Sequence, residues 1–354
     1  MFNYSSFFTL QQKDKPIFYW LLLGCLLVFV MVIVGGITRL TGSGLSMVDW
    51  HLMMDAIPPL NEEQWYEKFE AYKLFPEYQI VNYHFTLEEF KAIFFWEWLH
   101  RLLGRLIGVV FIVPYIYFLL KKKLSKKLII QTTILLGMGA LQGFIGWWMV
   151  KSGLVKDPDV SHFRLATHLI TAFLTFAYTL WVALGLLEPK IDFSTKFTGI
   201  KKWLNALLIL LIIQIIYGAF VAGLNAGFIM NTWPKMGDQW INDAVFAIKP
   251  LWKNFTEGLA GVQFIHRYLA LIVVGIIVFL WVKAAKHQVN IAQQNGLKLL
   301  LLIVFIQFLL GVFTLIYAVP LWLGVVHQVG AFFLLAATVF CVFLFKEKVR
   351  GGRQ

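Results

Sequence analysis

Eight long apolar stretches constrain the fold of this chain more than any other feature of its sequence. Each reaches the roughly 20 residues that a helix needs to cross a bilayer. Lipid offers no partner for unpaired backbone groups, so such stretches must be helical. They lie near residues 17–38, 93–120, 128–150, 164–187, 203–224, 259–282, 298–318 and 321–345. The sequence therefore predicts an all-α integral membrane protein with eight transmembrane helices.

Composition and charge placement favour a membrane protein over a nucleic-acid-binding one. Hydrophobic residues make up 59% of the 354 residues and charged residues 14%, whereas soluble domains are about half apolar and a quarter charged. The net charge of +12 comes largely from lysines in alternate short loops, such as KKKLSKK at 121–127. This positive-inside pattern predicts that both termini are cytoplasmic. Loops 39–92, 151–163 and 225–258 are then expected on the outer side.

Signals for processing and for cysteine chemistry are weak. The first span has no small-residue cleavage site after it, so we expect it to be retained. Cys25 and Cys341 both fall inside predicted spans and form neither a metal motif nor an outer-loop pair. Cysteine chemistry is therefore not expected to be the function.

The run FFWEWLHRLLGRLIG (94–108) places charged residues inside a predicted span. If the helix began after Arg105, Leu106–Leu120 would extend only about 22 Å, which is too short for the hydrocarbon core. Beginning at Glu97 gives about 36 Å, which fits with some tilt. His100 is then expected about one turn inside the outer face, where an ionisable residue usually marks a functional site.

The chain contains an internal repeat of four helices. His100-Arg101 matches His266-Arg267, the run HLITAF from His168 matches HQVGAF from His327, and QGFIG (142–146) matches QFLLG (307–311). The matched motifs are roughly 160 residues apart, as in a tandem duplication. Each unit has an even number of spans, so both copies have the same orientation in the membrane. We expect an N-terminal bundle over 1–200 and a C-terminal bundle over 201–354.

The repeat places four histidines at one depth, two in each bundle. Each has a small residue four positions later, on the same helix face: Gly104, Ala172, Ala270 and Ala331. A flat macrocycle could lie on such a face. The arginines near the outer helix ends that suit paired carboxylates are Arg39, Arg101, Arg105 and Arg267. This pattern predicts two bis-histidine haem sites, with iron held by His100 and His168 and by His266 and His327.

Glu97 is the clearest difference between the two halves. It stands three residues before His100, whereas Gln263 stands three before His266. A buried carboxyl group can serve as a proton acceptor or donor. The alternative is that Glu97 only pairs with Arg101 or another arginine. The first interpretation assigns the reactive site to the N-terminal bundle and a stable electron-carrying haem to the C-terminal bundle.

The sequence resembles the haem A synthase family over nearly its whole length. The passages that carry the resemblance are GGITRLTGSGLSMVDW (35–50), EWLHRLLGR (97–105) and NTWPKMGDQW (231–240), together with the four helix histidines. The family's fold is two pseudo-symmetric four-helix bundles. Its activity is oxidation of the C8 methyl of haem O to a formyl group, which gives the haem A of cytochrome oxidase.

The resemblance also implies roles for individual residues. His100 and His168 would ligate or position haem O as substrate, His266 and His327 would bind a haem b cofactor, and Glu97 would act at the oxidised methyl. A haem O synthase and an electron donor are the implied protein partners. Some bacterial members carry a cysteine pair in the first outer loop, which this chain lacks. It is similar instead to the cysteine-free class of mitochondria and Gram-negative bacteria. We expect the protein to lie in the bacterial inner membrane.

Two functions from other classes use the same histidines. A dihaem cytochrome would transfer electrons without modifying either haem, and a haem chaperone or transporter would release haem unchanged. Glu97 opposite Gln263, with the family resemblance, favours the enzyme.

Overall fold

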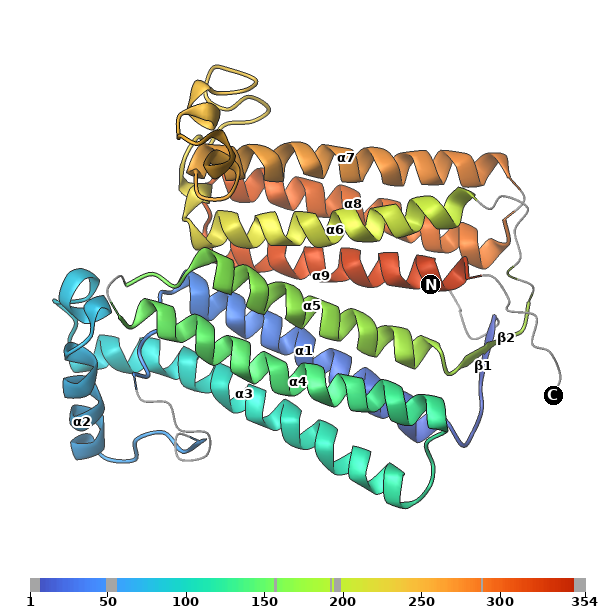
Figure 1. The fold of residues 1–354 in the computed structure, drawn as a ribbon, viewed down its shortest axis with the longest axis horizontal. Helices are drawn as coiled ribbons and strands as arrows, with labels where there is room; N and C mark the ends of the chain where they lie inside the picture. Colours follow the sequence, from blue (N-terminus) through green and yellow to red (C-terminus); the bar gives the residue numbers. More distant parts are fainter. Residues whose placement is uncertain are drawn as a thin grey trace.

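Eight membrane-length helices dominate the fold (Figure 1). The computed structural model describes residues 7–48, 56–155, 158–191, 193, 199–287 and 289–346. In that part of the chain, the helices long and apolar enough to cross a membrane are α1 (Lys15–Leu40), α3 (Leu87–Leu120), α4 (Lys126–Gly153), α5 (His162–Leu184), α6 (Gly199–Gly223), α7 (Leu259–Lys286), α8 (Ile291–Ile316) and α9 (Leu321–Leu344). The predicted all-α membrane fold is confirmed.

The helices form two groups of four that pack side by side. Helices α1, α3, α4 and α5 contact one another, and so do α6 to α9, while α1 and α5 also contact α6 and α9. The contact between the groups has an aromatic core, in which the rings of Phe176 and Phe332 have centroids 3.8 Å apart. Polar bonds add to it: Gln328 Nε2 donates to the carbonyl of Val32 over 2.9 Å.

Helix α3 begins at Leu87, earlier than the expected residue 93. A capping box starts it: the Thr86 backbone N–H donates to Glu89 Oε2 over 2.7 Å, and the Glu89 N–H donates back to Thr86 Oγ1. Length and hydropathy alone could not place this start, because the first turns carry Glu88 and Glu89. His100 is therefore thirteen residues into its helix, whereas His168, His266 and His327 lie six or seven residues into theirs.

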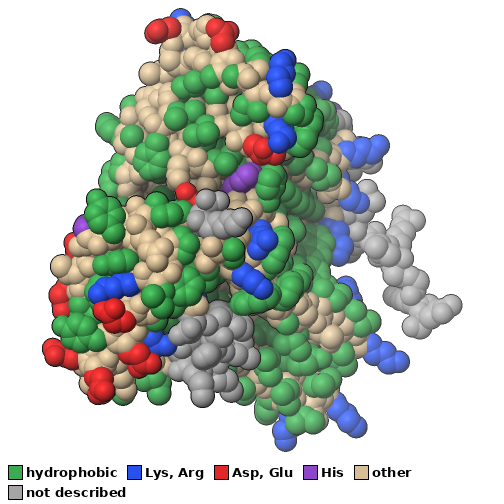
Figure 2. All heavy atoms as spheres, turned by 60° about the vertical axis from the view of Figure 1, so that its left-hand side comes forward, with side chains coloured by type: hydrophobic (Ala, Val, Ile, Leu, Met, Phe, Trp, Pro, Cys, Tyr) green, Lys and Arg blue, Asp and Glu red, His purple; other side chains and the backbone are tan. Residues whose placement is uncertain are grey.

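The connections between α1 and α3 and between α6 and α7 carry structure of their own at one end of the molecule, which we call the α2 end (Figure 1). The first holds α2 (Glu62–Lys73) and a five-residue π-helix η3 (Glu77–Val81); the second holds the 3₁₀ helices η4 (Ala226–Phe228), η5 (Asp243–Phe246) and η6 (Leu251–Phe255). Aromatic rings of α2 pack on the start of α3, with Phe69 and Phe90 centred 5.2 Å apart. In Figure 2 acidic side chains gather at this end and many basic ones lie along the opposite side.

A two-stranded ribbon lies at the other end of the molecule (Figure 1). Strand β1 (Phe8–Leu10) pairs antiparallel with β2 (Leu187–Pro189), with Thr9 opposite Glu188. The sequence predicted no strand here. Phe8 is buried in the core of the C-terminal bundle and stacks on Phe193 at 5.2 Å, so the ribbon ties the segment before α1 to the connection between the bundles.

Candidate functional site

The four predicted histidines come together as two pairs. The imidazole centroids of His100 on α3 and His168 on α5 are 6.5 Å apart, with planes inclined at 31°. Those of His266 on α7 and His327 on α9 are 6.4 Å apart and inclined at 83°. All four residues are half-buried. All four helices run from the α2 end, so each bundle presents one pair toward that end (Figure 1).

The spacing of each pair suits one metal ion between two imidazoles. With metal–nitrogen bonds of about 2 Å on both sides, two axial imidazoles have centroids roughly 6 Å apart. Both observed separations match this requirement. Among the described residues there is no group of three or more His, Cys, Asp or Glu side chains that could hold a metal ion. Two-point axial ligation, as in a haem, therefore fits these donors better than a site built from protein ligands alone.

Each imidazole packs against a glycine on a neighbouring helix. A Cβ placed on the glycine would lie close to Cε1 of the ring in all four cases. The pairs are Gly35 with His100 at 3.0 Å, Gly146 with His168 at 3.2 Å, Gly218 with His266 at 3.2 Å, and Gly311 with His327 at 2.9 Å. Such distances leave no room for a larger residue without a shift of the ring. The sequence pattern indicates the small residues four positions after each histidine. It does not indicate these glycines, because their contacts depend on which helices become neighbours.

Two glutamines contact the rings of the C-terminal pair. Nε2 of Gln214 on α6 lies 3.2 Å from Nδ1 of His266, and Nε2 of Gln307 on α8 lies 3.2 Å from Nδ1 of His327. Both side chains were missed as site residues. The spacing Gln-x-x-x-Gly could have found them, since it occurs at Gln307–Gly311 and again at Gln214–Gly218.

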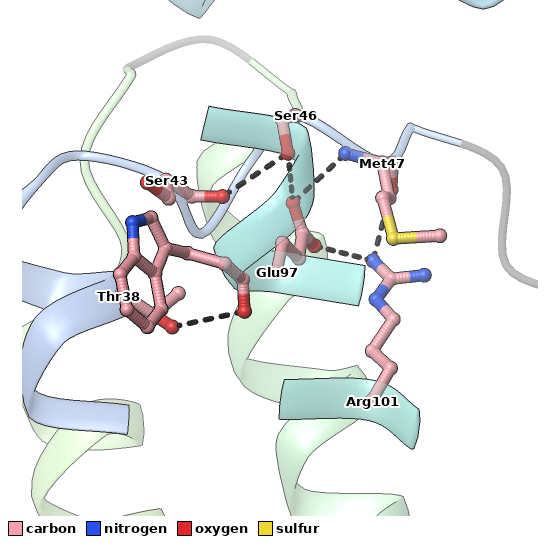
Figure 3. A network of polar contacts seen from close by, with 7 residues as sticks. Thr38, Ser43, Ser46, Met47, Glu97 and Arg101 are labelled. Atoms are coloured by element: carbon pink, nitrogen blue, oxygen red, sulfur yellow. Dashed lines mark hydrogen bonds and ion pairs between the residues drawn. The ribbon is translucent and has the colours of Figure 1, made fainter. Parts of the chain in front are cut away.

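Glu97 is buried and fully engaged (Figure 3). Its Oε1 accepts from Nη2 of Arg101 over 2.6 Å, and its Oε2 accepts from Ser46 Oγ over 2.7 Å and from the Met47 N–H over 2.8 Å. Arg101 also donates to the carbonyl of Met47 over 2.9 Å. These bonds tie the chain after α1 to α3. The pairing of Glu97 with Arg101, which the alternative interpretation of Glu97 expects, is present, one helical turn from His100.

In the C-terminal half the matched residues occupy the same place, but Gln263 donates hydrogen bonds where Glu97 accepts them. Gln263 donates from Nε2 to the carbonyls of Ala226 and Ile229 over 2.8 and 2.7 Å. Arg267 donates to three further carbonyls of the same connection, those of Met230, Thr232 and Lys235. In the N-terminal half a residue pair on α3 thus holds the connection that follows α1. In the C-terminal half the matched pair on α7 holds the connection that follows α6. In one half the first residue of the pair accepts from N–H and O–H groups, and in the other it donates to carbonyl groups.

Two of the predicted arginines carry an unused donor. Arg39 donates from Nη2 to the carbonyl of Ala222 over 3.0 Å and lies 3.9 Å from Asp159, so it links α1 to the end of α6. Nε of Arg39 and Nε of Arg267 are buried without a hydrogen-bond partner among the described residues. Carboxylate oxygens would satisfy such donors. Arg105 lies one turn beyond Arg101 on α3 and is half-buried.

Glu77 is a second buried carboxyl group, close to Arg39, and it lies in the expected loop 39–92, where the sequence pattern does not point to it. Burial raises its pKa to about 8, while the hydrogen bond from the Tyr72 hydroxyl, 3.0 Å long, acts in the opposite direction. The value of about 8 also includes the effects of Glu97 and Asp159, which raise the pKa, and of Arg39, which lowers it. No spacing in the sequence signals this group, because it depends on how α2 folds back onto α3.

Comparison with known proteins places the whole chain in one family. The sequence model of the COX15-CtaA family, described as Cytochrome oxidase assembly protein, matches residues 18–339. A protein named Heme A synthase from Flavobacterium psychrophilum is 57% identical over 341 residues, which cover 95% of this chain and 100% of the relative. Its namesake from Flavobacterium johnsoniae is 54% identical, covering 94% and 98%. One from Parvibaculum lavamentivorans is 43% identical, covering 94% and 95%.

Proposed function

The chain belongs to the COX15-CtaA family of cytochrome oxidase assembly proteins, and we propose that it is a haem A synthase, a multi-pass membrane enzyme that oxidises haem O to haem A. The C8 methyl of haem O would become a formyl group in a four-electron oxidation: two hydroxylations, each of which consumes one equivalent of an external two-electron oxidant, would give a geminal diol that loses water. Alongside the relatives, the observation that carries this proposal is the presence of two histidine pairs, each with the spacing of axial haem ligands.

The two bundles divide the work in this proposal. The N-terminal bundle, residues 1–200, holds haem O between His100 and His168, and the C-terminal bundle, residues 201–354, holds haem b between His266 and His327. When bound, haem b supplies electron transfer between the substrate site and an outside donor. The carboxylate at Glu97 beside the first pair, and its absence beside the second, support this assignment.

Glu97 is proposed to act one helical turn from the substrate ligand His100. Its carboxylate would take up a proton at Oε1 or Oε2 as the methyl is oxidised, while Arg101 stabilises the charged form before and after. The bonds from Ser46 and Met47 fix the carboxyl group in one orientation. A group that must act at one methyl of a bound macrocycle requires such positioning.

The haem propionates are proposed to meet arginines at the α2 end. The candidates are Arg39, Arg101, Arg105 and Arg267. Two of these offer a buried Nε without a partner among the described residues, and a propionate oxygen would complete it.

We further propose a bacterial inner membrane location with the α2 end on the outer side and both termini in the cytoplasm. Lysines in the α3–α4 connection and at the end of α7 support this orientation. Haem O arrives within the bilayer, which makes a haem O synthase and an electron donor the expected protein partners.

Pigment analysis of the purified protein tests the function. Protein made in cells that supply haem O should contain haem A and haem b. His266→Ala and His327→Ala should abolish the stable haem b spectrum, whereas His100→Ala should keep that spectrum and stop haem A formation. If haem A never appears while both pairs hold haem, the protein is a dihaem cytochrome and the enzyme proposal fails. An unchanged haem b spectrum in the first two variants would reject the assigned pairing.

A further inference from the structure

The side chain one helical turn before each ring-packing glycine makes different contacts in the two histidine pairs. Its position is four residues before the glycine that packs on each imidazole. Glutamine occupies it on α4, α6 and α8, as Gln142, Gln214 and Gln307, while α1 has Met31. The four positions are matched by the repeat, so differences in their contacts reflect differences between the two haem sites.

In the C-terminal pair both glutamines hold their imidazole in the same way. Nε2 of Gln214 lies 3.2 Å from Nδ1 of His266 and donates to the backbone carbonyl of the same residue over 3.0 Å. Gln307 makes the same two contacts with His327, also at 3.2 and 3.0 Å. Each amide therefore contacts both the ring and the backbone carbonyl of one histidine. This limits rotation of the imidazole about its side-chain bonds.

In the N-terminal pair neither ring is held in this way. Gln142 donates to Thr171 Oγ1 over 2.6 Å and to the backbone carbonyl of His168 over 3.4 Å, but it makes no contact with the ring, whose Nδ1 is buried without a partner among the described residues. His100 has no hydrogen bond to its ring within the described part of the chain, and the matched Met31 contributes only a thioether.

The side chain three residues after the histidine explains why Gln142 and Gln307 differ. Thr171 follows His168 at that distance and offers a hydroxyl group. Gly330 follows His327, and a Cβ placed on it would lie only 1.9 Å from Oε1 of Gln307. The amide of Gln307 occupies the space that a side chain at position 330 would fill, so the glycine leaves Gln307 free to face the ring.

Metal-bound histidines almost always use their second ring nitrogen in a hydrogen bond, which fixes the tautomer and raises the basicity of the ligand. An amide carries both a donor and an acceptor, so it can face Nδ1 in either protonation state. In the structure Nε2 of each glutamine faces Nδ1, while Oε1 of Gln214 and of Gln307 has no partner among the described residues. When Nε2 of the histidine is the metal ligand, Nδ1 carries the proton, and the amide then accepts it at Oε1 by turning over, which exchanges the bond to the histidine carbonyl for one to the ring.

We propose that Gln214 and Gln307 are positioning residues that make the C-terminal pair a permanent haem site, and that the lack of such contacts leaves the N-terminal pair free to accept and release its haem. This inference rests on the proposed function, in which one haem is a resident cofactor and the other becomes product. A product must leave, and rings without a fixed orientation form a site with weaker retention. A cofactor must stay through many turnovers.

The test uses the full-length protein from cells that make haem b and no haem O. Gln214→Leu and Gln307→Leu are compared with Gln142→Leu, the matched control. We expect the first two to lose haem b to an external acceptor about 10- to 100-fold faster than wild type. We also expect a higher reduction potential, because a less basic ligand stabilises ferric iron less. The control should keep both wild-type values.

Gln214→Glu separates an electronic effect from a packing defect. A carboxylate facing Nδ1–H is a stronger acceptor than the amide, so this variant should shift the reduction potential below that of wild type, opposite to Gln214→Leu. Wild-type retention and potential in both leucine variants would overturn the inference, and so would an equal change in Gln142→Leu. Wild-type protein that binds no haem b would instead reject the proposed function, so the two failures are distinguishable.

Discussion

At the residue scale, Glu97 both anchors the chain after α1 and lies one helical turn from His100, the proposed substrate ligand. Three donors from two segments converge on its carboxylate. Removing the charge would leave Arg101 without its buried partner and would present an amide N–H₂ to groups that are themselves donors. A variant at this position therefore tests chemistry only when it is compared with one that disturbs the anchor alone.

Glu97→Gln is expected to lower haem A formation about 100-fold or more while the haem b spectrum persists, because a proton acceptor beside the substrate is lost. Ser46→Ala is the control: it removes one hydrogen bond, worth about 1 kcal/mol, and keeps the carboxylate. Its activity should stay within a few-fold of wild type. Pigment extraction and separation of haem O, its hydroxylated intermediate and haem A give the measurement. Equal losses in both variants would assign Glu97 a purely structural role.

At the element scale, the membrane helices could be predicted from the sequence and the outer segments could not. Apolar length alone locates α1 and α4 to within a few residues, because lipid imposes one solution on such stretches. The start of α3 was missed, since its capping box lies in polar sequence. The contacts of Gln214 with His266 and the burial of Glu77 were missed because they depend on which helices become neighbours.

The packing of α2 against η3 and α3 should depend on pH through Glu77. Its pKa of about 8 in the folded protein lies above the roughly 4.3 of an unfolded chain. The folded form therefore binds the proton more tightly, and its stability is full below the unfolded pKa and falls as pH rises toward 8. The groups that act on it are the neutral Tyr72 hydroxyl, which donates a hydrogen bond, and the charged side chains of Glu97, Asp159 and Arg39.

Hydrogen exchange of the α2 amides, corrected for the intrinsic rate, measures this effect. Protection should fall by at most about tenfold per pH unit between pH 6 and 8. Glu77→Gln should flatten the dependence, since the amide does not titrate. Glu63→Gln, on the exposed surface of α2, should keep the wild-type profile. A profile that is the same in wild type and Glu77→Gln would show that another group controls α2.

At the scale of the whole molecule, the two bundles are joined along their length. Phe176 packs on Phe332 within the helices, Arg39 reaches the end of α6, and β1 pairs with the connection between the halves. At the α2 end, His162 Nε2 lies 2.8 Å from the carbonyl of Thr256. These contacts fix the two histidine pairs relative to one another, as the electron transfer proposed between them would require.

Cysteine labelling in intact cells tests the orientation of the whole molecule. Glu67→Cys on α2 should react with a membrane-impermeant maleimide from outside, whereas Lys127→Cys at the start of α4 should react only after permeabilisation. Both positions are exposed, and the native Cys25 and Cys341 are buried, which keeps the background low. The reverse labelling pattern would invert the proposed topology.

The opposite polarity of Glu97 and Gln263 has a consequence for ancestry. If both bundles descend from one four-helix unit, the connection after the first helix had to turn over in one copy, so that it presents carbonyls where the other presents N–H groups. A glutamate introduced at position 263 would now face the oxygens of Ala226 and Ile229. Single substitutions can therefore no longer interconvert the two halves, and their divergence is locked in the backbone as well as in the side chains.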